Sequence, residues 1–328
     1  MKPYRYALVC LLLSACLTPS PLTPGEMVSI TGRLAHEDGT AWADLNVLLK
    51  PPFAENKSTR SNAAGIYRFS LSGGETQVAG LAADMEVLAS GPEGQLVRQG
   101  VKALKTDVQL PAMYFWDGLQ TPATDTVLSG NRSVFSWLPP ASAVRYYRFS
   151  LRNPADELIW QSQSALPNLE LPLAVMDAGK AYSWQVTAFH SDYEAASRRR
   201  PLRAEPLLRP VSIRAIRGPD GTDYSSLHDG SFSFELADRL TYPETGKLEL
   251  LIELDRPIKV QGLHWAGSSF AADLELRTSP QAEPIVSHQM QDFTLLEWQP
   301  VETDRLYLRL HGESGRFVDL AEIRLLGP

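Results

Sequence analysis

A chain of 328 residues with 44% hydrophobic and 21% charged residues has the composition of a globular protein of two or three domains, which excludes disordered and fibrous classes. Its two cysteines, Cys10 and Cys16, lie near the N-terminus, so no disulfide framework or cysteine-ligated zinc site is expected downstream. The formal net charge is −7, and residues 209–328 alone carry 12 basic against 19 acidic side chains. Because a nucleic-acid binder needs clustered positive charge, no nucleic-acid partner is expected.

The N-terminal segment has the pattern of a secretion signal. Lys2 and Arg5 precede an apolar stretch over residues 7–13, which is far shorter than the roughly 20 residues that span a bilayer. Residues 13–16 then read Leu-Ser-Ala-Cys. This sequence resembles the lipobox of bacterial lipoproteins, and the resemblance implies removal of residues 1–15 and lipidation of Cys16. The alternative is a cleaved signal peptide in which Cys16 has no role.

A lipidated Cys16 would attach the mature protein to a membrane through buried acyl chains. Leu17 follows the cysteine, where an aspartate would suggest inner-membrane retention in enteric-type bacteria, so the resemblance favours an outer-membrane lipoprotein. Residues 16–26 are rich in proline, which predicts an extended tether before the first domain.

Residues 27–115 form the first of three blocks, which are numbered by their order in the chain. Short alternating runs separated by turn residues predict a small β-sandwich, and Tyr67, Phe69 and Leu71 share one face of the clearest run. The runs cover residues 28–30, 45–49 and 66–71. A Gly-Arg-Leu strand, an Asp-Gly turn and an Asn-x-x-Gly-x-Tyr-x-Phe strand occur in that order. This order resembles the carboxypeptidase regulatory-like, transthyretin-like domain, which implies a stabilising or attaching module without catalysis.

Residues 116–208, the second block, contain strand-like runs at roughly ten-residue spacing, which is typical of a sandwich of about seven strands. The runs cover residues 134–137, 146–151, 158–160, 169–172 and 182–186. They resemble a fibronectin type III domain, with Trp137 and Tyr147 in paired core strands. Tyr182 matches the corner at which a tyrosine hydroxyl bonds to the backbone. Alternation assigns Trp184 to the core and not to a sugar-stacking surface, whereas Trp160 could be exposed.

Residues 209–328 form the third block. Its strand-like runs alternate apolar and polar residues with period two, which predicts an antiparallel jelly-roll sandwich. The runs cover residues 248–254, 258–265, 274–277, 306–310 and 320–325. Five motifs occur in order: an Asp229-Gly230 turn, a Leu-Asp-x-Pro sequence, a tryptophan-bearing strand, a Tyr-x-Arg-Leu strand and a closing Ala-Glu-Ile-Arg. This order resembles the discoidin, or coagulation-factor type C, group of galactose-binding-like domains. We therefore expect an all-β chain, with three tandem β-sandwich domains after a cleaved lipoprotein signal peptide.

In many discoidin-like domains the Asp-Gly loop and the glutamate of the last strand flank a structural calcium ion. The resemblance places Asp229 and Glu322 at these positions, and Asp223 lies close enough in sequence to contribute. Calcium takes six to eight oxygen ligands, but Ser231 stands where the family has a second aspartate. The alternative is a solvated turn and a strand-end carboxylate without a metal. No other cofactor is expected.

Ligands in this group bind to loops at one end of the roll, so the resemblance suggests four contacts: His228, Phe232, Phe234 and Phe270. The sequence has no metalloprotease, nucleophile-elbow, phosphate-loop or dinucleotide motif, and His264 is expected to be a single strand histidine. We therefore expect a non-catalytic envelope lipoprotein that presents a jelly roll to a glycan or an envelope partner on two spacers. The alternatives are a structural subunit of an envelope assembly and an accessory component of a hydrolase system.

Overall fold

The computed structural model describes residues 27–51, 55–72, 77–78, 81–82, 84–102, 106–232, 237–267, 273–289 and 292–328. In these residues the chain is almost entirely β-strand, with two short 3-10 helices, η1 (Leu173–Val175) and η2 (Ser225–His228), so the predicted all-β class is confirmed. The signal peptide, Cys16 and the tether lie outside the described residues. None of the described helices is long and apolar enough to cross a membrane.

The chain forms two compact units. Among the described residues, the first unit comprises those within 27–92, 96–115 and 192–194, and the second comprises those within 93–95, 116–191 and 195–328. The second and third blocks, apart from residues 192–194, therefore belong to one unit.

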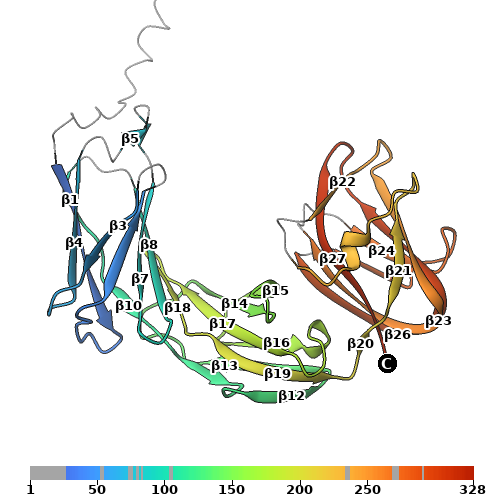
Figure 1. The fold of residues 1–328 in the computed structure, drawn as a ribbon, viewed down its shortest axis with the longest axis horizontal. Coiled ribbons are helices and arrows are strands. Elements are labelled where there is room, and N and C mark those ends of the chain that lie inside the picture. The colour runs from blue at the N-terminus through green and yellow to red at the C-terminus, as the bar shows by residue number, and fades with distance from the viewer. Residues whose placement is uncertain are drawn as a thin grey trace, which may run out of the picture. The chain divides into compact units, whose positions relative to one another are not determined.

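The first unit is a sandwich of two main sheets (Figure 1). One sheet has the order β10-β1-β4, with β9 also paired to β1, and the other includes β8-β7-β2-β3. The strands are β1 (Met27–His36), β2 (Asn46–Lys50), β3 (Lys57–Arg60), β4 (Ile66–Ser72), β5 (Gln77–Val78), β6 (Leu81–Ala82), β7 (Met85–Ser90), β8 (Leu96–Val101), β9 (Val108–Gln109) and β10 (Met113–Phe115). Tyr67, Phe69 and Leu71 are buried on one face of β4, as the alternation predicts.

The second block also has two layers. Strands β11, β13 and β16 form one sheet, while β12, β19, β17, β14 and β15 are joined in the other, and β18 pairs with β17. The strands are β11 (Leu119–Thr121), β12 (Thr126–Gly130), β13 (Arg132–Trp137), β14 (Tyr146–Arg152), β15 (Leu158–Ser164), β16 (Asn168–Pro172), β17 (Ala181–Phe189), β18 (Glu194–Ala196) and β19 (Arg200–Pro206).

Aromatic side chains fill the core between these layers. Phe135 lies edge-on to Trp184 with ring centroids 5.1 Å apart, and Trp137 lies edge-on to Tyr147 at 5.3 Å, both favourable arrangements. The Tyr182 hydroxyl accepts a hydrogen bond from the backbone N–H of Asp177 at 2.7 Å. The predicted burial of Trp137, Tyr147 and Trp184 and the tyrosine corner are therefore confirmed. The prediction that Trp137 and Tyr147 lie on paired strands is wrong, because β13 and β14 belong to opposite sheets and face each other across the core.

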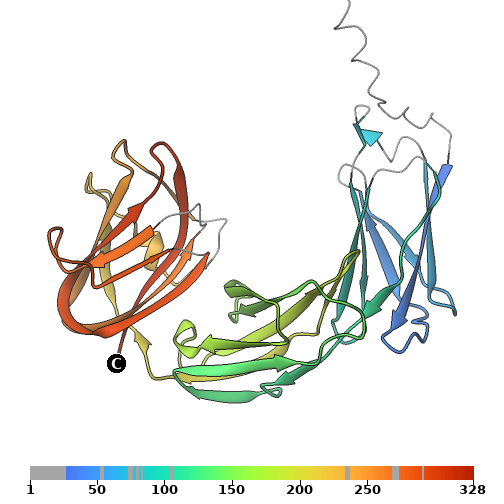
Figure 2. The same cartoon turned by 180° about the vertical axis from the view of Figure 1, so that it is seen from behind.

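The third block is an antiparallel sandwich built around two long, bent strands, β23 and β26 (Figures 1 and 2). The first part of β23 pairs with β21 and with the end of β26, whereas its last part pairs with β27 and the start of β26. The strands are β20 (Arg209–Pro210), β21 (Ile213–Arg217), β22 (Asp238–Thr241), β23 (Lys247–Gly267), β24 (Asp273–Arg277), β25 (Val286–Gln289), β26 (Phe293–His311) and β27 (Phe317–Gly327). Two strands shared by both layers give the predicted jelly-roll form.

One predicted strand boundary is wrong. The runs at residues 248–254 and 258–265 are parts of the single strand β23, whose register with β26 shifts between Glu253 and Ile258. Pro257 has no backbone N–H and cannot donate to the ladder, so this position forms an irregularity within the strand instead of ending it.

Candidate functional site

The predicted Asp229-Gly230 turn packs against the last strand. The Asp229 Oδ1 atom accepts the backbone N–H of Ser231 at 2.7 Å, and Gly230 has a φ of 88°, a left-handed conformation that favours glycine. In this conformation the Gly230 N–H donates to Glu322 Oε2 at 3.1 Å. The turn is therefore fixed by a carboxylate of β27.

Glu322 is a buried carboxylate with a buried cationic partner. Its side chain is 2% exposed, and its Oε1 lies 3.1 Å from Nε of Arg324, whose side chain is 13% exposed. Burial raises the pKa of Glu322 to about 7, although the neighbouring Arg324 acts in the opposite direction. The pair thus replaces water around Glu322 with a guanidinium group and a backbone N–H.

Arg324 also contacts two other parts of the second unit. Its Nη1 lies 3.2 Å from Oδ1 of Asp177 in the second block, and its Cζ lies 4.5 Å from the ring centroid of Phe232, within the range of a cation–π contact. One guanidinium therefore binds two carboxylates and covers an aromatic ring. We name Glu322, Arg324, Asp177 and Phe232 the arginine cluster.

These residues do not fit the calcium site that the resemblance implies. No three His, Cys, Asp or Glu side chains in the described ranges gather closely enough to hold a metal ion. Glu322 is already paired with Arg324, and Asp223 lies in an earlier loop whose backbone bridges to Arg217. Arg324 supplies the positive charge beside Glu322, so we assign no metal here.

The four predicted ligand contacts do not form one site among the described residues. His228, at the end of η2, lines a hollow of about 260 Å³ together with Asp229 and Glu322. Phe232 is 2% exposed and lies against Arg324, so it offers no free face for a sugar ring. Phe234 and Phe270 lie outside the described residues.

His264 is a packed histidine and not a ligand. It is fully buried, its ring lies 5.4 Å from that of Phe232, and burial lowers its pKa to about 3. It is therefore neutral at physiological pH. Trp160 packs against it with ring centroids 6.0 Å apart, so Trp160 is only partly exposed.

A hollow of about 340 Å³ adjoins the arginine cluster, and its polar groups are bound to one another. Lys180 Nζ lies 2.9 Å from Asp177 Oδ2. Asn153 Nδ2 donates to Glu157 Oε2 at 2.6 Å. These side chains would have to give up existing partners to bind a ligand.

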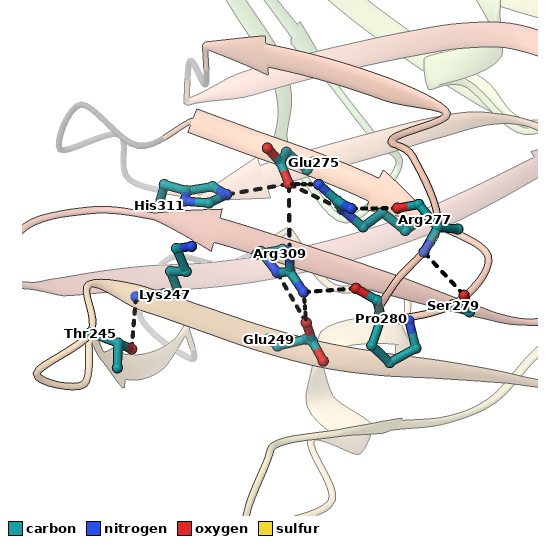
Figure 3. Close-up of polar contacts among 10 residues, drawn as sticks. Thr245, Lys247, Glu249, Glu275, Arg277, Ser279, Pro280, Arg309 and His311 are labelled. Atoms are coloured by element: carbon teal, nitrogen blue, oxygen red, sulfur yellow. Dashed lines mark hydrogen bonds and ion pairs between the residues drawn. The ribbon is translucent and has the colours of Figure 1, made fainter.

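A second polar network, on the outside of the third block, is likewise internally paired (Figure 3). Arg309 Nη2 donates to Glu249 Oε2 at 2.7 Å, and Arg277 Nη2 donates to Glu275 Oε2 at the same distance. His311 Nε2 lies 3.4 Å from Glu275 Oε2. The cation of each pair has a carboxylate partner on the same or a neighbouring strand, which indicates a structural role.

A different environment occurs where β23 and β26 lose their regular pairing. Val260 pairs with Val301, but Gly262 pairs with Glu297, so β26 has extra residues between these positions. Such a bulge turns side chains away from the ladder. Trp298, Gln299 and Pro300 occupy it and line a hollow of about 350 Å³, which we name the Trp298 pocket.

The tryptophan of this pocket is held in place. Trp298 Nε1 donates to the carbonyl oxygen of Val260 at 3.2 Å, and the side chain packs against the third block's hydrophobic core while remaining half-buried. Its indole ring is therefore part of a preformed wall, and little conformational entropy would be lost when a ligand binds.

The polar side chains of the Trp298 pocket are available for hydrogen bonding. Asn131, Gln261, Glu297 and Gln299 line the pocket, and within the described part of the chain none of these four side chains makes a hydrogen bond or an ion pair. Together they offer three amides and one carboxylate. The remaining lining residues are Leu207, Leu208, Pro300, Pro328 and Trp298 itself.

Sequence reasoning missed this pocket. The only local signal is a Glu-Trp-Gln-Pro sequence at residues 297–300, in which a proline and a tryptophan interrupt an alternating strand. Asn131 comes from the second block, and a single sequence cannot show that it faces the third.

No protein-family model matches this chain, and no curated protein matches it. Among solved structures, the CBM32 module of AlyQ in complex with 4,5-unsaturated mannuronic acid is 14% identical; the match covers 35% of this chain and 96% of that chain, with a TM-score of 0.27. A chitosan-binding module of a Paenibacillus sp. IK-5 chitosanase/glucanase is 13% identical, with coverages of 36% and 98% and a TM-score of 0.26.

A Clostridium perfringens module, CpGH89CBM32-5 in complex with GalNAc-β-1,3-galactose, is also 13% identical, with coverages of 36% and 94% and a TM-score of 0.26.

Proposed function

We propose that this protein is a non-catalytic, glycan-binding lipoprotein of the cell envelope, and that the glycan binds in the Trp298 pocket. The observation that carries the proposal is the combination, in one hollow of about 350 Å³, of a fixed tryptophan and four polar side chains that have no partner among the described residues. The volume lies in the usual range of small-ligand sites.

The chemistry of the pocket suits a sugar ring. A sugar presents an apolar face of C–H groups that can pack on an indole, and hydroxyl groups at its edge that both donate and accept hydrogen bonds. Gln261 and Gln299 can do both in return, while Glu297 accepts. Because these groups have no partners to lose within the described part of the chain, each new hydrogen bond replaces only a bond to water.

The sequence supports a tethered and non-catalytic protein. The lipobox-like residues 13–16 and the proline-rich residues 16–26 support an anchor at Cys16, with the outer membrane as the proposed location. The first two blocks would then be spacers. The absence of a catalytic motif from the sequence supports binding without turnover.

A glycan array tests this function. We would use residues 16–328 with Cys16→Ser, so that the protein is isolated without lipid, and compare Trp298→Ala with Trp42→Ala. Trp42 is a matched control because it is also half-buried and stacks on His36 in the first unit, with ring centroids 4.0 Å apart. We expect the parent and Trp42→Ala to bind the same glycans and Trp298→Ala to bind none. Failure of the parent to bind, or full binding by Trp298→Ala, would contradict the proposal.

One observation favours a second candidate, a structural subunit of an envelope assembly. Val134, Leu138 and Leu166 are each more than half exposed. Val134 lies on β13 and Leu138 directly follows that strand, and the N–H of Trp137 donates to the carbonyl oxygen of Pro167 beside Leu166. A pull-down with the mature chain in which a partner is lost on Leu138→Ser, but not on Trp298→Ala, would favour this candidate.

A further inference from the structure

We infer that the Trp298 pocket selects its glycan by charge: it excludes sugars that carry a carboxylate and binds an amino sugar more tightly than the neutral sugar of the same ring. This inference rests on the proposed function, because it names the class of glycan for the same pocket.

The first observation is the charge of the lining. Of the nine described residues that line the pocket, Glu297 alone has a charged side chain. It is exposed on β26, opposite Gly262. No arginine or lysine among these nine residues could neutralise it.

The second observation is the contrast with three carboxylates of this block that have cationic partners. Glu249 and Glu275 bind Arg309 and Arg277, and Glu253 lies 3.0 Å from Nη2 of Arg214. Among the residues that the structure describes, Glu297 has no such cation, and its charge remains available to a ligand. The third block also carries seven more acidic than basic groups, 19 against 12, which adds to a negative field.

These charges act differently on three sugars of the same ring. The carboxylate of a uronic acid would face Glu297 without a cation to bridge them, which disfavours binding. A protonated amine could donate a charge-assisted hydrogen bond to Glu297, which is stronger than the bond from a neutral hydroxyl. The neutral sugar, which carries neither charge, should fall between the two.

The test is a titration of residues 16–328 carrying Cys16→Ser with matched methyl glycosides. The glucose, glucosamine and glucuronic acid glycosides, and the same three in the galactose series, differ in one group each. At pH 6.5 and low salt we expect the amino sugar of the recognised series to bind about tenfold more tightly than the neutral sugar, and the uronic acid about tenfold more weakly. Added salt should reduce both differences.

Two variants locate the effect. Glu297→Gln keeps the shape and hydrogen-bonding capacity of the side chain, so the three affinities should converge to within about twofold. Glu302→Gln is the control because Glu302 is exposed on the same strand but lies outside the pocket, and it should keep the full selectivity.

The outcomes separate the two claims. Uronic acid binding as tight as that of the neutral sugar, or unchanged selectivity in Glu297→Gln, would overturn this inference and leave the glycan site standing. A parent chain that binds none of the six sugars, and nothing on a glycan array, would overturn the proposed function and the inference together.

Discussion

The arginine cluster and the Trp298 pocket lie in the same compact unit but use polar side chains in opposite ways. In the cluster Arg324 is bound to Glu322 and Asp177 and covers Phe232. In the pocket Gln261 and Gln299 lie beside a fixed tryptophan, and neither amide has a hydrogen-bond partner among the residues that the structure describes. The family resemblance placed a functional site at the arginine cluster, where the polar groups are bound to one another. The Trp298 pocket, to which the resemblance assigned no function, is open to a ligand.

Polar groups that bind one another stabilise the fold, whereas polar groups that have no protein partner are available to a ligand. A buried charge without a partner is costly, so the pairing in the cluster is required for folding. Half-exposed amides can be solvated, and leaving them unpaired costs the fold little. Substitutions in the cluster should therefore change stability, and substitutions in the pocket should change binding.

The largest expected effect is that of Arg324→Met. It leaves the carboxylate of Glu322 buried without its cation, which should reduce the free energy of unfolding by about 3–5 kcal/mol above pH 7. Urea unfolding followed by tryptophan fluorescence measures the change. Arg239→Met is a matched control, because Arg239 also pairs with a carboxylate, Asp319, and covers a ring, that of Phe317, but is exposed. Its cost should stay below about 1 kcal/mol, and equal costs for both variants would contradict the comparison.

A smaller effect concerns pH. Burial raises the pKa of Glu322 from 4.5 to about 7, so between these values the folded protein binds more protons than the unfolded chain. This group's contribution to stability is present below pH 4.5 and is lost as the pH rises through 7, by ~1–3 kcal/mol. The free energy of unfolding in urea is measured across this pH range for the parent and for Glu322→Gln. The difference between the two curves isolates the contribution of Glu322 from those of other titrating groups. A difference that is constant across this range would show that Glu322 is not buried as described.

A modest effect is expected from a single pocket amide. Gln299→Ala should weaken glycan binding about three- to tenfold, the value of roughly one hydrogen bond, without changing the urea midpoint. Gln281→Ala, an exposed glutamine in a turn of the third block, should alter neither quantity. Loss of stability in Gln299→Ala would place Gln299 among the structural residues instead.

The smallest expected effect is that of calcium. Because no described group of acidic side chains can hold a metal ion and Arg324 already pairs with Glu322, thermal unfolding with calcium and with a chelator should coincide. A site occupied at a hundredfold excess over Kd would add about 2.7 kcal/mol, which is several degrees in Tm. A calcium-dependent increase in Tm of that size, which is lost in Asp229→Ala, would show that calcium binds at this loop.

The sequence was sufficient to predict much of the fold, because strand periodicity and core composition are local signals. The buried face of β4, the core positions of Trp137 and Trp184, and the corner at Tyr182 follow from alternation and from family resemblance. The continuity of β23 did not follow, because a Leu-Asp-x-Pro sequence has the appearance of a strand end, whereas both halves of the strand pair with β26.

The candidate site was much harder to predict. Arg324 and Asp177 are 147 residues apart, and no local pattern indicates that an arginine would stand beside Glu322. The Trp298 pocket depends on an irregular stretch of β26 and on Asn131 from another block. Both sites depend on contacts between distant segments, and a single sequence does not specify these.

The most direct test of the central claim locates the bound glycan among the seven tryptophans. With nitrogen-15-labelled protein, the indole N–H signal that is missing from Trp298→Phe identifies Trp298, whose Nε1 donates to Val260. Addition of an array-selected glycan should shift this signal in proportion to binding and leave the fully buried Trp184 and Trp265 unchanged. Saturating glycan that leaves the Trp298 signal in place and shifts that of Trp160, which packs against His264, would contradict the account.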